Sequence, residues 1–401
     1  MEKVPKIRFP EFSEVWKHRH LNQIVERVIR KNKGTVSNLP LTISARHGLV
    51  DQETFFNKTI ASENLEGYYL LKKGEFAYNK SYSNGYPFGA IKRLDRYEKG
   101  ALSSLYICFK PLENVNSNYL KYYFETGKWH KEVSMIAIEG ARNHGLLNIA
   151  VLDFFETLHY IPAKDEQDKI AEFLSLIEKE LELQEQKLKA VNDYKKGMMQ
   201  NIFSQELRFK DDEGNEFPKW EKKKLDEITT INPKSPTLPE KFVYIDLECV
   251  KSGRLLKKNV ISKQEAPSRA QRLAEHQDIF FQMVRAYQKN NFFFEEDADS
   301  LPVVVSTGYA QLRTNQDPKF LFYLLHTPSF VSKVLTRSTG TNYPAINSRD
   351  LAEIRVFIPI LEEQIKIGKL FSELDKQIEK QEKKLALLKQ QKRALLQQMF
   401  V

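Results

Sequence analysis

The residues of this chain that could do chemistry are hydrogen-bond donors and cations on polar loops. The clearest loop lies in GYYLLKKGEFAYNKSYSNGYPFGAIKRL, residues 67–94, where alternating apolar residues and Gly/Asn turns predict two strands joined by a loop. Lysine and arginine can contact phosphate groups, and asparagine and tyrosine can form hydrogen bonds with the edges of nucleic-acid bases. A solvated turn beside a strand is the alternative interpretation. The candidate residues here are Lys80, Tyr82, Asn84, Lys92 and Arg93.

Other polar turns add candidates in both halves of the chain. The segment QDIFFQMVR, residues 277–285, predicts a buried strand that ends in an arginine, whose fork suits a phosphate or the O6 and N7 atoms of guanine. The arginines of PSRAQR, residues 267–272, lie either on such a contact loop or on an exposed helix. The polar loop STGTNYP follows at residues 338–344. These and similar turns add Arg46, Arg142, Asn143, Arg269, Arg272, Arg285, Lys289, Thr339 and Asn342 to the candidate DNA-contacting residues.

No catalytic signature accompanies these candidates. The chain has no GxxxxGK[ST] phosphate-binding loop, no HExxH, no CxxC and no Gly-rich turn that would open a dinucleotide or S-adenosylmethionine site. The segment NPKS at residues 232–235 lacks the second proline and the aromatic residue of an amino-methyltransferase motif. The eight histidines are scattered without the spacing of metal ligands. We therefore expect no catalytic, cofactor-binding or metal-binding residue in this chain.

Charge and composition limit the class of protein. The 401 residues carry a formal net charge of +9, which favours polyanionic partners such as nucleic acid or a membrane surface. No apolar run approaches the ~20 residues that a membrane span needs, and the N-terminal MEKVPKIRFPEF has no apolar signal core. Cys108 and Cys249 are far apart in the chain, as in proteins of a reducing compartment. We expect a cytoplasmic protein without a membrane partner.

The frame that must position the loops is duplicated. IPAKDEQDKIAEFLSLIEKELELQEQKL begins at Ile161, and IPILEEQIKIGKLFSELDKQIEKQEKKL begins at Ile358. Upstream of these units, WKHRHLNQI begins at Trp16 and WEKKKLDEI begins at Trp220. The chain therefore repeats the order linker, domain and helix, with inserts 17–160 and 221–357 that differ in most of their sequence. A duplicated frame with divergent inserts indicates one mechanical task performed twice with two specificities.

Each repeat ends in a long helix with the apolar spacing of a coiled coil. Steps of four and three residues alternate over four to five heptads, which an ordinary amphipathic helix on a globular core does not require. Gln184 and Lys195 interrupt the first seam, and Gln381 and Lys392 interrupt the second at the same two positions. The predicted seam comprises Ile170, Leu174, Ile177, Leu181, Gln184, Leu188, Val191, Ile367, Phe371, Leu374, Ile378, Gln381, Leu385 and Leu388.

The charges of the two helices predict that they pair in opposite directions. Residues 163–183 and 184–204 carry net charges of −4 and +2, whereas residues 360–380 and 381–401 carry −1 and +4. An antiparallel pair places −4 beside +4, and a parallel pair places charges of like sign together. In the antiparallel register Gln184 faces Gln381, and we expect a polar layer there that fixes the register.

We therefore expect an α+β fold: two mixed α/β domains separated by two long helices that form an antiparallel coiled coil. The expected segments are an N-terminal arm with the first domain at 1–162, a helical spacer at 163–206, a linker with the second domain at 207–359, and a second helical spacer at 360–401. Each helix of about 40 residues would be roughly 60 Å long and would separate the domains. Since the arm 1–16 corresponds to the linker 205–220, Val401 should lie near Met1, which closes a pseudo-twofold, circular repeat.

This layout resembles the specificity (S) subunits of type I restriction-modification systems. The resemblance covers the whole chain, and its most specific parts are the two IP-x3-EQ-x2-I units at residues 161–170 and 358–367. Further matches are the FPEF and FPKW linkers, GEFAYNKSYSNGYPFGAIKRL, PSRAQR and STGTNYPAINSRDL, and GLLNI at residues 145–149 looks like a variant of the last of these. Ala286 is a departure, because the family often has proline after the arginine.

The resemblance implies recognition of DNA without catalysis by this chain. Each insert would be a target recognition domain that reads one half of a bipartite, asymmetric target in double-stranded DNA. The coiled coil would set the spacer between the halves and dock two methyltransferase (M) subunits, and the complex could recruit two restriction (R) subunits. S-adenosylmethionine, ATP and Mg would belong to those partners, which methylate flipped-out adenines and hydrolyse ATP to translocate and cleave DNA.

Two other classes of function fit parts of the sequence. A coiled-coil scaffold that joins proteins would bind DNA weakly and without regard to sequence, even with its partners present. An enzyme with an unrecognised site, such as a nuclease, would be active as the purified chain with a metal ion alone.

Overall fold

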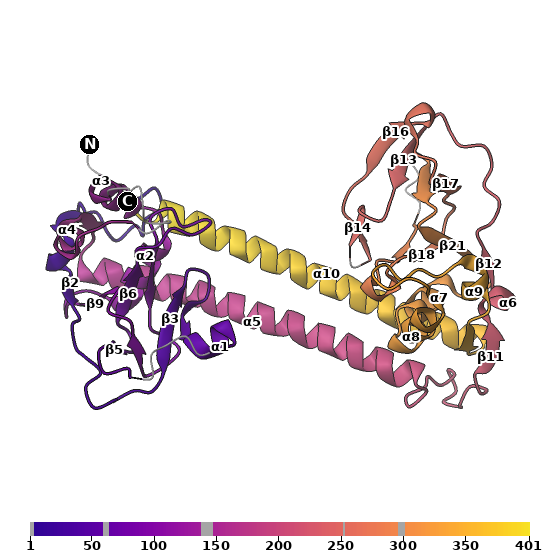
Figure 1. The fold of residues 1–401 in the computed structure, drawn as a ribbon, viewed down its shortest axis with the longest axis horizontal. Coiled ribbons are helices and arrows are strands. Elements are labelled where there is room, and N and C mark those ends of the chain that lie inside the picture. Colours follow the sequence, from indigo (N-terminus) through magenta and orange to yellow (C-terminus); the bar gives the residue numbers. More distant parts are fainter. Residues whose placement is uncertain (1–3, 59–63, 138–146, 252, 296–300) are drawn as a thin grey trace. The chain divides into compact units, whose positions relative to one another are not determined.

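The computed structural model describes residues 4–58, 64–137, 147–251, 253–295 and 301–401 (Figure 1). The chain forms two compact units. Unit 1 comprises Met1–Glu185 and Lys384–Val401, and unit 2 comprises Gln186–Lys383. Each unit thus contains one of the predicted inserts together with one end of each long helix. No helix among the described residues is long and apolar enough to cross a membrane.

The described residues of unit 1 form two four-stranded sheets and one two-stranded sheet. The first sheet has the order β2-β9-β6-β7, with strands Val25–Arg27, Ile107–Pro111, Phe76–Asn79 and Ala90–Arg93. The second has the order β4-β3-β8-β5, with strands Gly48–Asp51, Pro40–Ser44, Lys99–Leu102 and Tyr69–Lys72. The third pairs β1 (Lys17–His20) with β10 (Leu158–Ile161). The short helices are η1 (Leu21–Gln23), α1 (Gln52–Phe56), α2 (Ser117–Glu125), α3 (His130–Ile136) and α4 (Val151–Glu156).

The described residues of unit 2 form two four-stranded sheets and two two-stranded sheets. The first has the order β12-β21-β18-β19, with strands Thr229–Ile231, Tyr309–Thr314, Ile279–Gln282 and Phe292–Phe293. The second has the order β16-β13-β20-β17, with strands Asn259–Ser262, Lys241–Ile245, Val303–Ser306 and Ala270–Leu273. Two pairs complete it: β11 (Glu221–Lys224) with β22 (Arg355–Ile358), and β14 (Val250–Lys251) with β15 (Arg254–Leu255). The short helices are α6 (Leu225–Ile228), η2 (Lys263–Glu265), η3 (Ala286–Gln288), α7 (Pro318–Leu325), α8 (Pro328–Arg337) and α9 (Ser348–Ala352).

The two inserts share one topology although they share little sequence. Each unit has a four-stranded sheet whose two central strands pair in parallel, β3 with β8 in unit 1 and β13 with β20 in unit 2. In each unit a short strand after the linker pairs antiparallel with the strand that leads into the next long helix. This pairing ties the beginning of each insert to its end, which is why the repeated Trp and Ile-Pro segments flank both inserts. The predicted α+β class with two mixed domains is confirmed.

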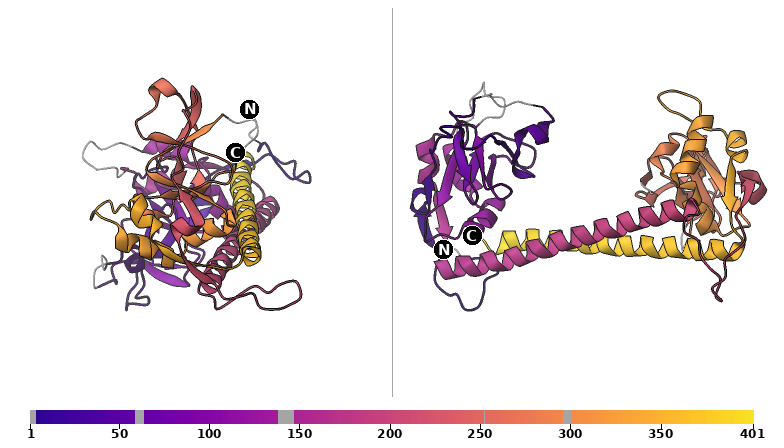
Figure 2. Two further views of the ribbon diagram at one scale, coloured as in Figure 1. Left: turned by 90° about the vertical axis from the view of Figure 1, so that its right-hand side faces the viewer. Right: turned by 90° about the horizontal axis from the view of Figure 1, so that it is seen from below.

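The long helices α5 (Lys164–Phe203) and α10 (Leu361–Gln398) run in opposite directions within each unit (Figure 2). In unit 1, Ile170 and Leu174 of α5 share a core with Leu396 of α10, close to its C-terminal end. In unit 2, Ile202 at the end of α5 shares a core with Ile367 near the start of α10. The antiparallel direction predicted from charge is therefore confirmed. Gln184 belongs to unit 1 and Gln381 to unit 2, and the polar layer between them stays a prediction.

The predicted seam residues are all at least half-buried, as a contact face requires. Those that are buried are Ile170, Leu174, Gln184, Ile367, Phe371, Leu374, Ile378 and Leu388. Those that are half-buried are Ile177, Leu181, Leu188, Val191, Gln381 and Leu385. The two lysines that interrupt the seam have ion-pair partners on the opposite helix: Lys392 lies 3.0 Å from Glu178, and Lys195 forms an ion pair with Asp375.

The glutamates of the two IP-x3-EQ units are buried acceptors that hold the linkers in place. Glu166 is 2% exposed and accepts hydrogen bonds from Arg8 at 2.8 Å and from the indole of Trp16 at 3.2 Å. Glu363 is 0% exposed and accepts from Arg208 and Trp220 in the same way, at 2.6 and 3.1 Å. A buried carboxylate is stable only when it is paired, so each glutamate requires its linker arginine.

The glutamines of the same units join each long helix to its domain. The Gln167 side chain accepts from the backbone N–H of Asn116 at 2.9 Å and donates to the Pro162 carbonyl at 3.0 Å. Gln364 repeats both contacts, accepting from Asp317 at 3.1 Å and donating to Pro359 at 2.8 Å. Asn116 and Asp317 are the N-caps of α2 and α7. The motif therefore fixes the entry of each long helix against the first turn of a domain helix.

The N-terminal arm of unit 1 lies beside the end of α10. The backbone N–H of Ile7 donates to the Gln398 carbonyl at 3.1 Å. The equivalent contact in unit 2 is the 3.0 Å bond from Leu207 to Asn201 at the end of α5. Met1 lies outside the described residues, but the arm takes the place that the linker takes in the other unit, as the circular repeat predicts.

Candidate nucleic-acid interface

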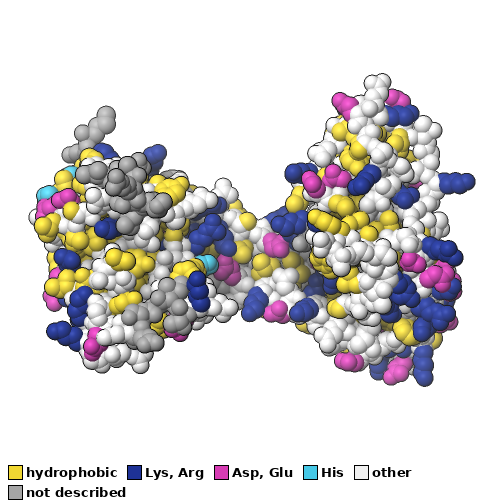
Figure 3. Space-filling model, in the orientation of Figure 1, with side chains coloured by type: hydrophobic (Ala, Val, Ile, Leu, Met, Phe, Trp, Pro, Cys, Tyr) yellow, Lys and Arg dark blue, Asp and Glu magenta, His cyan; other side chains and the backbone are white. Residues whose placement is uncertain are grey.

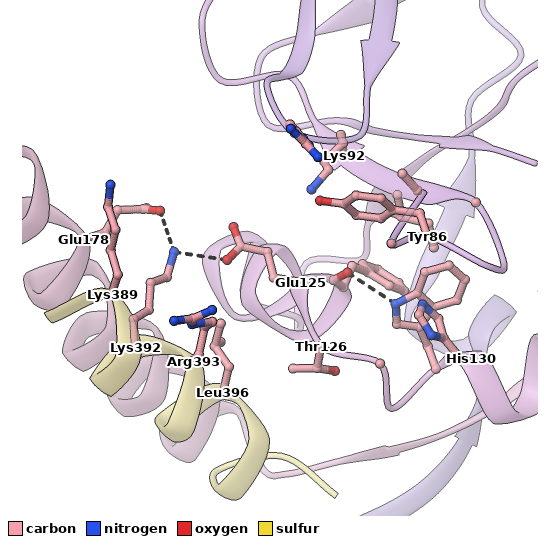
Figure 4. Close-up of a pocket in the computed structure, with 18 of the residues that line it drawn as sticks. Tyr86, Lys92, Glu125, Thr126, His130, Glu178, Lys389, Lys392, Arg393 and Leu396 are labelled. Carbon is pink, nitrogen blue, oxygen red and sulfur yellow. Dashed lines mark hydrogen bonds and ion pairs between the residues drawn. The ribbon is translucent and has the colours of Figure 1, made fainter. Parts of the chain in front are cut away.

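A basic groove in unit 1 combines predicted loop residues with residues of α10 (Figure 4). The groove has a volume of about 1180 Å³. Its walls come from the β3–β4 turn, the β6–β7 hairpin, the residues that follow α2, and the facing sides of α5 and α10. The cationic side chains that line it are Arg46, Lys92, Lys389, Lys392 and Arg393.

Two glutamates in the groove neutralise only part of this charge. Lys392 lies 3.0 Å from Glu178 and 3.1 Å from Glu125. Burial alone would lower the pKa of Lys392, but the charges of the two glutamates outweigh that effect and raise the pKa. Burial by itself would raise the pKa of Glu178. The hydrogen bonds and charges from Lys121 and Lys392 outweigh burial and lower the pKa to about 2. This cluster stays charged and holds α2, α5 and α10 together.

The remaining cations of the groove are available for a ligand. Lys389 forms an exposed ion pair with Glu185 at 2.7 Å. Within the described part of the chain, no carboxylate forms an ion pair with Arg46, Lys92 or Arg393. The Lys92 ammonium lies 5.6 Å from the centre of the Tyr86 ring, and burial lowers its pKa. Cations without acidic partners around an open groove favour a phosphate-bearing ligand.

The β6–β7 hairpin presents some of its predicted residues and uses others internally. Tyr82 is 59% exposed, and Asn84 is also exposed at the tip. Lys80 is half-buried, and its ammonium donates to the Ile149 carbonyl at 3.1 Å. The hairpin depends on Gly89, which has φ +77° and where an added Cβ would lie 2.0 Å from the Asn79 carbonyl oxygen.

Arg93 has a structural role that the sequence did not reveal. Its guanidinium donates to Asp95 at 2.6 Å, to Ser117 at 3.0 Å and to Asn118 at 2.8 Å, and the side chain is 12% exposed. It therefore fastens β7 to the start of α2 instead of facing solvent. Arg142 and Asn143 lie outside the described residues.

In unit 2 the predicted arginine and the predicted polar loop lie together. The guanidinium carbon of Arg285 lies 4.1 Å from the centre of the Tyr343 ring. The Arg285 backbone N–H donates to the Pro344 carbonyl at 2.8 Å, and Arg285 has the left-handed backbone angles φ 55° and ψ 49°. Tyr343 is 61% exposed, and Thr339 and Asn342 are exposed on the same loop. An arginine stacked on an exposed tyrosine offers both donors and a flat surface to a base pair.

The other predicted residues of unit 2 are dispersed. Arg269 is exposed immediately before β17, and Arg272 is half-buried within that strand, so the helical interpretation of PSRAQR is wrong. Burial lowers the pKa of Arg272. Lys289 donates to the His326 carbonyl at 2.9 Å and lines a second groove of about 880 Å³.

This second groove occupies the place in unit 2 that the basic groove occupies in unit 1. Lys195 and Asp375 line it and form an ion pair, and the Tyr323 hydroxyl donates to Asp375 at 2.7 Å. The same three chemical groups occur in unit 1 as Lys392, Glu178 and Tyr122. In the second groove Arg254 forms an ion pair with Glu382, and Glu379 adds another carboxylate. The second groove is therefore more nearly neutral than the first.

Sequence reasoning missed Lys389 and Arg393 as ligand-facing residues. The signal was present, because residues 381–401 carry a net charge of +4. Pairing between the helices accounts for only part of that charge, and the rest faces the groove. Among the described residues no group of three or more His, Cys, Asp or Glu is placed to hold a metal ion.

Comparison with known proteins shows what this chain is similar to. Residues 218–390 match the family described as the type I restriction modification DNA specificity domain. The chain is 25% identical over 252 residues to the type I restriction enzyme MjaVIII specificity subunit of Methanocaldococcus jannaschii, which covers 59% of either protein. It is 27% identical over 165 residues to the HindI specificity subunit of Haemophilus influenzae, which covers 40% of this chain and 35% of the relative.

A solved structure shows the same fold over the full chain. The crystal structure of the type I restriction-modification system S subunit from M. genitalium has a TM-score of 0.57 and 15% sequence identity to this chain. The structural alignment covers 100% of this chain and 99% of the M. genitalium chain. The sequence alignments cover only 59% and 35% of the lengths of the two curated relatives. Residues 218–390 of this chain are thus similar in sequence to type I DNA specificity domains, and the fold of the whole chain is similar to that of a solved S subunit.

Proposed function

We propose that this chain is the DNA sequence-recognition subunit of a type I restriction-modification complex, and that each unit reads one half of a bipartite, asymmetric target. The observation that carries the proposal is that two units of one topology present different polar side chains at equivalent places. Leu147 donates to the Lys80 carbonyl beyond β6, and Ile346 donates to the Met283 carbonyl beyond β18.

The residues that follow these equivalent contacts differ in chemistry. In unit 1 they include the exposed Tyr82 and Asn84, whereas in unit 2 they lead to Arg285 stacked on Tyr343. The tyrosine hydroxyl can form a single hydrogen bond with a base edge, and the asparagine amide can form two. The guanidinium group of arginine has two parallel donors that suit guanine. Equivalent scaffolds with unlike side chains would read unlike half-sites, which makes the whole target asymmetric.

The chemistry of modification and cleavage is assigned to partner subunits. We expect two methyltransferase subunits and two restriction subunits, with S-adenosylmethionine, ATP and Mg bound by them. The long helices would supply the docking surface for the methyltransferase subunits, and their length would set the spacer between the half-sites. In this proposal the chain contributes positions and hydrogen bonds but no reacting group.

Methylation mapping tests the proposal in cells that carry the chain and its partners. The modified adenines should define a two-part motif with a spacer of constant length. The double variant Arg285→Ala/Tyr343→Ala should alter one half of that motif and leave the other half and the spacer unchanged. The matched control Tyr287→Ala removes another exposed tyrosine of the same segment and should leave the motif intact.

Other results would favour other functions. Binding of DNA without sequence preference by the assembled complex would indicate a scaffold. Cleavage of DNA by the purified chain with Mg²⁺ alone would indicate a nuclease. A change in both halves of the motif in the Arg285→Ala/Tyr343→Ala variant would contradict the assignment of one half-site to each unit.

A further inference from the structure

Unit 2 contains a third cavity, away from the groove beside the long helices. It has a volume of about 500 Å³ and lies between β11, α8 and β22. Lys and Arg side chains gather along the edge of unit 2 that carries β11 (Figure 3). We call this cavity the basic notch, and its lining residues are Lys222, Lys333, Arg337, Glu353, Arg355 and Phe357.

The positive charge of the basic notch is neutralised only in part from within the unit. Its one carboxylate, Glu353, forms an ion pair at 2.7 Å with Lys224, which lies outside the lining. In the described ranges no carboxylate forms an ion pair with Lys222, Lys333, Arg337 or Arg355. Burial lowers the pKa of Lys333, and the charges of Lys222 and Arg337 lower it further. Four cations that repel one another favour an anionic ligand at this place.

The fold itself does not require this cluster of cations. The equivalent strands of unit 1 are β1 and β10, where His18 stacks on Tyr160 with ring centres 4.4 Å apart. Lys222 and Phe357 occupy the matching paired positions of β11 and β22. Leu158 begins β10 where Arg355 begins β22. The strand pairing is thus made in unit 1 without these charges, so the charges of unit 2 have another role.

The position of α8 indicates which polyanion the basic notch meets. Arg337 is the last residue of α8, and the chain continues directly into the loop that carries Thr339, Asn342 and Tyr343. A duplex that met this loop would extend its sugar-phosphate backbone past the end of α8. Arginine and lysine side chains contact such phosphates without reading the bases.

We infer that the basic notch binds backbone phosphates of duplex DNA beside the half-site read by unit 2. This inference rests on the proposed function and deepens it, because it assigns sequence-independent affinity to a defined surface. The exposed side chains Lys222, Arg337 and Arg355 are the direct contacts. Lys333, whose ammonium donates to the Arg355 carbonyl at 2.9 Å, adds charge from the inner wall.

The salt dependence of DNA binding by the full-length chain tests this inference. Affinity for a duplex of about 40 base pairs would be measured by fluorescence anisotropy from about 50 to 200 mM salt. The test variant is Lys222→Gln/Arg337→Gln, and the control is Lys241→Gln/Lys257→Gln, which also removes two exposed lysine or arginine charges from unit 2. Loss of two phosphate contacts should reduce the slope of log K against log salt by about two units. The factor by which affinity falls between about 50 and 200 mM salt should therefore be about tenfold smaller for the test variant than for the original chain. The slope of the control variant should stay within about half a unit of the original slope.

Each result bears on the inference. An unchanged slope in the test variant overturns it, as does an equal loss in the control. If the test variant keeps its DNA slope but loses binding to poly-L-glutamate, the basic notch is a site for an acidic protein segment and the inference is wrong. If the unsubstituted chain binds no duplex at any salt concentration, the proposed function itself fails, which distinguishes that failure from failure of the basic notch alone.

Discussion

The ammonium of Lys392 on α10 lies 3.0 Å from the carboxylate of Glu178 on α5. Glu178 also accepts from Lys121 at 2.6 Å and from the Tyr122 hydroxyl at 3.1 Å, both on α2. One carboxylate therefore joins the two long helices to the first domain. Because it is only 27% exposed, its loss would leave two cations partly buried without their partner.

Substitution of Glu178 should destabilise unit 1. Glu178→Gln keeps the shape but removes the charge, and we expect a loss of about 1–2 kcal/mol in the free energy of unfolding. Urea denaturation measures this loss. Glu180→Gln is the matched control, because Glu180 is 49% exposed and pairs with Lys384 at 3.4 Å, and it should cost less than about 0.5 kcal/mol. Equal losses in the two variants would contradict the role assigned to Glu178.

The same carboxylate should make the free energy of unfolding depend on pH in the acidic range. Glu178 has a folded pKa of about 2, below its ordinary value of 4.5, so the folded state favours its ionised form. Its contribution is fully present above pH 4.5 and is lost as the pH falls towards 2. Unfolding curves measured between pH 6 and 2.5 should fall less steeply for Glu178→Gln than for the original chain. Parallel curves would show that this group does not titrate as described.

The buried glutamates of the two IP-x3-EQ units should be among the most sensitive positions. Glu363→Ala would leave the Arg208 guanidinium and the Trp220 indole without their acceptor, and we expect a loss of about 3–5 kcal/mol. Glu362→Ala, at a neighbouring position that is 55% exposed, serves as the control and should be nearly neutral. Thermal unfolding distinguishes the two, and a neutral Glu363→Ala would mean that the linker is held by other contacts.

Two glycines of the β6–β7 hairpin separate the cost of backbone strain from the cost of a steric clash. Gly85 and Gly89 both have positive φ, at +85° and +77°, so alanine is strained at either position. An added Cβ meets nothing within 4 Å at Gly85 but lies 2.0 Å from the Asn79 carbonyl oxygen at Gly89. Gly85→Ala should cost about 1 kcal/mol, and Gly89→Ala should cost at least twice as much. Similar costs would mean that the hairpin shifts freely.

Arg393, which lines the basic groove, and Arg93, which does not, should differ in what they affect. Arg393→Gln removes a cation without an acidic partner, and we expect weaker DNA binding with a salt slope reduced by about one unit and unchanged stability. Arg93→Ala removes three internal hydrogen bonds and should instead lower stability, by about 2 kcal/mol. Anisotropy and urea denaturation on both variants provide the test, and a reversed pattern would exchange the two roles.

The local patterns of this sequence were enough to predict its frame. The heptad spacing of α5 and α10 depends on residues three and four apart, and their opposite direction follows from the net charges of their halves. The hairpin around residues 80–86 was predictable because alternation and turn residues also act locally. The tie between the arm and the long helix was visible only as a repeated motif, since Arg8 and Glu166 are far apart in the sequence.

Only the tertiary structure decided which cations face a ligand and that the inserts share one topology. Arg93 looked like a phosphate contact, yet Asp95, Ser117 and Asn118 occupy its donors. Arg393 looked like a charge for helix pairing, yet it lines the groove with Arg46. The physical reason is that the period of a helix is set by neighbours along the chain, whereas a groove and a sheet order are set by which distant segments pack together.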